Sequence, residues 1–176
     1  SAYVAVLAAL LIGLAFGIVQ GFLVTYMGIQ PFIVTLATQL ITYGVLLLYI
    51  MINGNNGQPL SGLDNSFKNF VTGSLVKFFG VPIPNYVWYA CVVVVFMWFM
   101  WNKTTFGKNL YAVGGNPEAA AVSGISVFAV TLGAFIMAGI LYGFGSWLEC
   151  TRMVGSGSAA YGQGWDMDAI AACVVG

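Results

Sequence analysis

The chain has 176 residues, of which 60% are hydrophobic and 6% are charged, with as many acidic as basic residues and no histidine. Soluble domains carry about 25% charged residues, and even a small one leaves much of its surface in water. The composition therefore excludes a soluble globular domain and, because clustered Lys and Arg are lacking, a nucleic-acid partner. It predicts an all-α polytopic transmembrane helical bundle in contact with membrane lipid.

Apolar stretches divide the chain into membrane spans, which we expect to belong to one transmembrane domain over residues 1–176. A bilayer core about 30 Å thick requires about 20 apolar residues in a helix. We expect spans at about 1–27, 31–52, 86–101 and 127–147, and the start of another span at 166–176.

Small residues recur within two of these spans. Gly13, Gly17 and Gly21 are spaced by four residues in the first span, and Gly139 and Gly143 form a second such pair in the fourth. Glycines at this spacing lie on one helix face and allow another membrane helix to approach closely. The pattern predicts close helix packing at both stripes.

Two polar stretches separate the spans. Residues 53–85 are rich in Asn, Gly and Pro and are expected to form an external loop, with a short interfacial helix around 66–79. Residues 102–126 carry Lys103 and Lys108 close to a span end. The positive-inside rule favours the cytoplasmic side for such a loop.

One short segment within residues 102–126 has complete helix start and stop signals. Asn116 is a favoured N-cap, Pro117 suits the first helical position, and Glu118 suits the positive end of the helix dipole. Three alanines follow, and Gly124 can end the helix in the left-handed conformation. A helix of about seven residues is marginal in water, so it needs a surface to dock on. That surface is either a partner protein or the rest of the same loop.

The second span carries polar side chains and no charge. They are Thr35, Thr38, Gln39 and Thr42. Polar groups at membrane depth face protein or a water-filled cavity. These residues are candidates for the lining of a translocation path for neutral polyols, or for hydrogen bonds between helices.

Several stretches of the chain resemble the permease subunits of ribose/galactose-type ABC sugar importers. They are residues 30–36, 101–108, 114–120, 123–125, 168–172 and Gly176. The resemblance extends over nearly the whole chain and is closest to the permeases for galactose and methyl galactosides. It identifies the chain as a central fragment of a longer permease.

The resemblance implies a subunit that carries a monosaccharide across the bacterial inner membrane. It implies three protein partners: an ABC ATPase subunit that binds ATP and magnesium, a second permease copy, and a periplasmic or extracellular sugar-binding protein. The chain itself is expected to hold no cofactor and no metal. The resemblance assigns the ATPase-coupling loop to Gly115, Asn116, Pro117, Glu118, Ala119, Ala120 and Gly124.

The chain is expected to be a transporter subunit and not an enzyme. It has no GxxxxGK[ST] phosphate-binding loop and no histidine for acid–base catalysis. Two alternatives need no ATPase partner: a secondary transporter, which requires an ionisable group inside the membrane that the centres of the four expected spans lack, and a channel-type membrane protein. Near the end of the fourth span, Glu149 and Arg152 are three residues apart and are expected to form a local ion pair.

Overall fold

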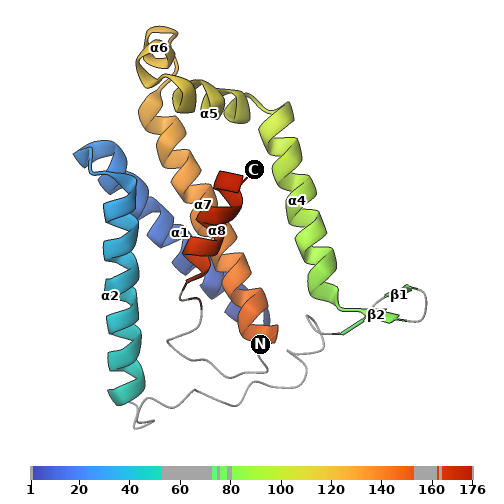
Figure 1. The fold of residues 1–176 in the computed structure, drawn as a ribbon. Helices are drawn as coiled ribbons and strands as arrows, with labels where there is room; N and C mark the ends of the chain where they lie inside the picture. The colour runs from blue at the N-terminus through green and yellow to red at the C-terminus, as the bar shows by residue number, and fades with distance from the viewer. Residues whose placement is uncertain are drawn as a thin grey trace.

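The computed structural model of the chain describes residues 2–52, 73–74, 76–78, 81–152, 162 and 164–175. Its helices are α1 (Ala2–Met27), α2 (Pro31–Ile52), α4 (Asn85–Lys103), α5 (Thr105–Gly115), α6 (Pro117–Val122), α7 (Val127–Arg152) and α8 (Trp165–Val175). Four of them, α1, α2, α4 and α7, are long and apolar enough to cross a membrane. The prediction of a polytopic helical bundle is confirmed (Figure 1).

A small β-hairpin precedes α4. Strand β1 (Val76–Phe78) pairs antiparallel with β2 (Val81–Ile83), with Val76 opposite Ile83. The short interfacial helix expected around 66–79 is therefore wrong at 76–78, where β-branched and aromatic residues favour an extended backbone. Residues 66–72, 75 and 79 lie outside the described part of the chain.

Residues 102–126 contain two helices where the sequence predicted one. Helix α5 fills the stretch before the predicted helix and ends at Gly115, and α6 follows after Asn116. Gly114 and Gly115 belong to the last turn of α5. Figure 1 shows α5 running across the ends of α4 and α7, with α6 beyond it.

Helices α1 and α7 make the most extensive helix contact among the described elements, and they cross in the centre of Figure 1. The two predicted glycine stripes face each other there. A Cβ on Gly17 would lie 2.5 Å from the Phe135 carbonyl oxygen, and one on Gly143 would lie 2.5 Å from the Ala9 carbonyl oxygen. The backbones are thus in direct contact, and the prediction of close packing at both stripes is confirmed.

Helix α4 meets α7 in a different way, through aromatic side chains. Tyr89 lies 6.5 Å, between ring centroids, from Phe144 and 6.2 Å from Trp147, and the latter two are 5.6 Å apart. Large rings therefore hold these two helices apart, while glycines let α1 and α7 touch. Helix α2 packs mainly on α1.

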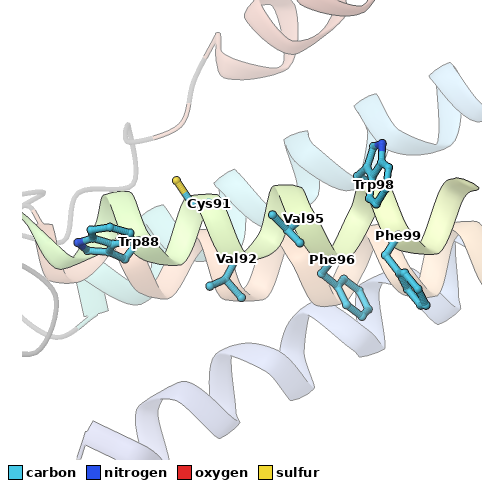
Figure 2. A pocket seen from close by; sticks show the side chains of 7 residues that line it. All are labelled: Trp88, Cys91, Val92, Val95, Phe96, Trp98 and Phe99. Atoms are coloured by element: carbon cyan, nitrogen blue, oxygen red, sulfur yellow. The ribbon is translucent and has the colours of Figure 1, made fainter. Parts of the chain in front are cut away.

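One face of α4 is apolar and open. Figure 2 shows a hollow on this face, lined only by residues of α4: Trp88, Cys91, Val92, Val95, Phe96, Trp98 and Phe99. A sugar site needs several convergent hydrogen-bonding groups. This hollow offers little besides hydrocarbon, so it suits lipid or another apolar helix and not a polyol.

Candidate functional site: the connection from α4 to α7

The connection begins with a tight corner between α4 and α5. Thr104, in extended conformation, is the N-cap of α5: its hydroxyl accepts a hydrogen bond from the Gly107 N–H (3.2 Å) and donates one to the Met100 carbonyl (2.6 Å). Gly107 is buried, and a Cβ there would lie 2.7 Å from the Met100 carbonyl oxygen. The threonine cap and the glycine therefore turn the chain sharply at the end of α4.

Helix α5 then packs against α7 through Phe106. A Cβ on Gly133 of α7 would lie 2.8 Å from the Phe106 ring, so the ring sits directly on the helix backbone. Phe106, Leu110 and Val113 are half-buried, while Lys108 and Tyr111 are exposed. Helix α5 thus has an inner apolar face that packs on α7, and an outer face whose exposed side chains end in polar groups.

Asn116 both ends α5 and starts α6. Its backbone N–H donates to the Ala112 carbonyl (3.1 Å), and its side-chain oxygen accepts from the Ala119 N–H (3.0 Å). Pro117 follows in the first turn, where a missing N–H costs nothing. Glu118 occupies the same turn and places its carboxylate near the positive end of the helix dipole.

The end of α6 is equally well defined. The Ile125 N–H donates to the Ala120 carbonyl (3.0 Å), and the Gly124 N–H donates to the Ala121 carbonyl (3.0 Å). This pair of bonds is a Schellman motif, which requires a left-handed residue after the helix. Gly124 meets that requirement with φ +82°. The start and stop signals of the sequence therefore fix both ends of a helix of six residues.

The predicted coupling residues divide into an inner and an outer set. Ala120 is buried, with 4% of its surface exposed, because α6 packs on α5 and α7. Glu118 and Ala119 are exposed. Val122 was not among the predicted coupling residues, yet it is 91% exposed and is the largest apolar side chain on the outer face of α6. Its hydrophobicity was the available signal, but its direction depends on how α6 sits on α5.

The remaining coupling residues, Gly115, Asn116, Pro117 and Gly124, are exposed as well. The polar residues of the second span lie on another element, α2, which is not among the main neighbours of α5 or α6. The structure does not bring these two predicted sets together.

The threonines of α2 satisfy their hydroxyl donors within their own helix. Thr38 donates to the Val34 carbonyl and Thr42 to the Thr38 carbonyl, both at 2.7 Å, and Thr35 donates to the Pro31 and Phe32 carbonyls at 3.1 Å. Gln39 is exposed, and its amide makes no side-chain hydrogen bond with the described residues. Of the four path candidates, Gln39 is therefore the one whose side chain needs an outside partner.

At its far end α7 carries the ion pair that the sequence predicted. Two nitrogens of the Arg152 guanidinium contact the Glu149 carboxylate, at 2.6 and 2.9 Å, so the prediction of a local pair is confirmed. Among the described residues no group of three or more His, Cys, Asp or Glu side chains could hold a metal ion.

Four membrane-length helices and a capped surface helix define this chain as a multi-pass membrane protein with a structured loop between spans. It belongs to the permease family described as "Branched-chain amino acid transport system / permease component", whose model matches residues 1–176. No solved structure matches the chain.

Three curated relatives illustrate the similarity. The galactose/methyl galactoside import permease protein MglC of Salmonella typhimurium is 43% identical over 94% of this chain and 48% of its own length, and that of Treponema pallidum is 46% identical over 92% and 30%. The ribose import permease protein RbsC of Escherichia coli K12 is 35% identical over 100% of this chain and 53% of its own length. The chain thus spans about half the length of most of the curated relatives it matches.

Proposed function

We propose that this chain is part of the membrane-spanning permease subunit of an ATP-driven ABC importer for a monosaccharide in the bacterial inner membrane. The names of relatives support a sugar, since they include permeases for galactose, allose and ribose. The family description refers to branched-chain amino acids, so the substrate class rests on the relatives and not on the family. Identities of 42–46% to the galactose/methyl galactoside permeases, against 32% for allose and 35% for ribose, favour galactose or a methyl galactoside.

The observation that carries the proposal is the geometry of α6. Six residues are too few for a helix that is stable by itself, yet both ends are capped and Ala120 packs inward. The outer face presents Glu118, Ala119 and Val122 at the end of the spans. Small side chains beside one apolar residue suit a close contact with a partner, here the ATPase subunit.

In this proposal ATP and magnesium bind to the ATPase subunit, and the present chain holds no cofactor. The loop from α4 to α7 lies on the cytoplasmic side and the loop at 53–85 on the external side, where a sugar-binding protein delivers the substrate. Two permease copies form the path, and closure of two ATPase subunits on ATP acts on it through α6.

The path residues follow from the same proposal. A neutral polyol needs hydrogen-bonding groups without strong charge, and Thr35, Thr38, Gln39 and Thr42 offer them on α2. Gln39 carries most weight because an unsatisfied amide facing lipid costs several kcal/mol, on the order of 2–7. Labelling of a cysteine at position 39 by a water-soluble maleimide tests this point, and labelling only by lipid-phase reagents would contradict it.

The decisive experiment replaces Ala119 in the full-length permease, reconstituted with its ATPase subunit and binding protein in liposomes. We expect Ala119→Arg to reduce galactose uptake and sugar-stimulated ATP hydrolysis by about tenfold or more, because a long side chain holds the docked surfaces apart. Ala119→Ser keeps the small side chain and serves as the matched control. Ala120→Arg is a poorer test, since Ala120 is buried within the loop itself.

Two results would contradict the proposal. Normal coupling in Ala119→Arg would remove α6 from the ATPase interface. Galactose uptake by the full-length permease without any ATPase would favour a secondary transporter or a channel-type protein. Competition by ribose or allose, measured in the same liposomes, reports the sugar preference.

A further inference from the structure

The level of α5 relative to the membrane follows from the lengths of its neighbours. Helix α4 has 19 residues, which at 1.5 Å per residue span about 28 Å. The hydrocarbon core of a bilayer is about 30 Å thick, so α4 is just long enough to cross it. Lys103 is the last residue of α4, and α5 starts at Thr105. Helix α5 therefore begins at the boundary between hydrocarbon and lipid headgroups.

The contact between α5 and α7 gives a second, independent estimate of the depth of α5 in the membrane. Phe106 packs on Gly133, which lies six residues inside the first residue of α7 and thus about 9 Å along its axis. Helix α7 has 26 residues, or about 39 Å, and exceeds the hydrocarbon core by about that much. The charged Glu149–Arg152 pair takes up part of this excess at the other end of α7, so Gly133 and the Phe106 ring that packs on it lie at or just inside the edge of the hydrocarbon. In Figure 1 α5 crosses the span ends, and α6 lies farther out.

The side chains around α5 are those of a membrane interface. Trp98 and Trp101 on the last turns of α4 are 59% and 39% exposed, and Tyr111 on α5 is 67% exposed. Trp and Tyr gather at headgroup level because their rings are apolar at one end and polar at the other. Lys103 and Lys108 are both exposed on the same connection.

The two lysines have no acidic partner within the described part of the chain, where the ion pair found joins Arg152 and Glu149. Two ammonium groups at headgroup level complement the phosphates of anionic lipids. We infer that α5 is an interfacial helix lying in the plane of the membrane, and that its Lys108, together with Lys103 at the end of α4, binds the phosphate groups of anionic phospholipids. The inference requires only that the chain crosses a membrane, and it stands apart from the proposed sugar import.

The first test measures lipid preference around the full-length protein in liposomes. Brominated phosphatidylglycerol and brominated phosphatidylcholine quench tryptophans that they contact, and the ratio of quenching gives their relative binding constants. Comparison with Trp101→Phe isolates the signal beside the lysines. We expect Lys103→Gln and Lys108→Gln each to lower the preference for phosphatidylglycerol about fivefold, which corresponds to about 1 kcal/mol per lysine near an anionic surface. Lys103→Arg and Lys108→Arg keep the charge and should keep the preference.

An unchanged preference in the double Gln variant would overturn the inference. So would loss of ATPase-subunit binding in that variant with lipid preference intact, because the lysines would then belong to a protein interface.

The second test measures depth directly. Spin labels are attached at Tyr111→Cys and, as the matched outer site, at Val122→Cys, in full-length protein whose Cys91, Cys150 and Cys173 are replaced by Ser. We expect the label at position 111 to be shielded from a water-soluble nickel relaxant and the label at position 122 to be fully accessible. Equal accessibility at the two sites would place α5 in water and overturn the inference, whatever the lipid preference.

Discussion

The contact between α1 and α7 and the connection through α5 and α6 are built on opposite principles. In the contact between α1 and α7, glycines from two distant segments of the chain meet, and each stripe is needed only because the other helix packs against it. In the second, α6 is defined by neighbours in sequence, from the Asn116 cap to the Gly124 stop. Glycine serves both regions. In the contact between α1 and α7, the glycine seam, it serves by lacking a Cβ, and at the end of α6 it serves by its positive φ. The first region depends on tertiary packing and the second on local hydrogen bonds.

The largest effect is expected in the seam. A Cβ at position 139 would lie 2.9 Å from the Gly17 Cα, so backbone must move. We expect Gly139→Ala to lower the free energy of unfolding by about 1–3 kcal/mol, as overpacking does, measured by thermal denaturation of the full-length protein in detergent. Gly145→Ala on the same helix is the matched control, because nothing lies within 4 Å of its Cβ position. There the substitution should be neutral or stabilising by up to about 1 kcal/mol. Equal destabilisation at both positions would contradict the close contact.

The end of α6 should be sensitive to backbone conformation and not to space. Nothing lies within 4 Å of the Cβ position of Gly124, but its φ is +82°. We expect Gly124→Val to cost about 1–2 kcal/mol, the penalty of a left-handed conformation for a residue with a Cβ, and, under the proposed function, to impair coupling to the ATPase. Gly124→Asn should cost less, since Asn tolerates this region. Equal behaviour of Val and Asn would show that the Schellman turn does not matter.

The smallest effect is expected at the start of α6. Asn116→Ala removes the acceptor for the Ala119 N–H and should cost about 1 kcal/mol. Amide hydrogen exchange at Ala119 should accelerate accordingly, whereas Asn116→Asp keeps an acceptor oxygen and should keep the protection. Glu118→Ala should destabilise α6 even less, by about 0.3–1 kcal/mol, because it removes only the interaction of the carboxylate with the helix dipole. Unchanged exchange in Asn116→Ala would mean that packing on α5, and not the cap, holds this helix.

The sequence predicted the features that depend on residues close together in the chain, and few of those that depend on tertiary contacts. Apolar length located the spans, and the signals at Asn116, Pro117 and Gly124 located α6, because caps act over three or four residues. Helix α5 was missed because Gly107, Gly114 and Gly115 suggest breaks, although only tertiary contact explains why Gly107 must lack a side chain.

The sequence also did not predict which helices pack against each other or which side chains of α6 point outward. Both glycine stripes were visible, but that they face each other depends on the relative placement of two spans more than 100 residues apart in sequence. Ala120 and Ala119 are alike in sequence, and only the position of α5 buries one and exposes the other. Val122 escaped notice for the same reason.

The seam also has a mechanical consequence. Where backbones touch, no side chain can change rotamer to absorb a displacement, and interiors packed this closely transmit strain. Four residues separate the end of α6 from the start of α7, and α7 then runs about 39 Å to the Glu149–Arg152 pair. A displacement of the α6–α7 connection would therefore be passed directly from α7 to α1, because the two backbones are in contact.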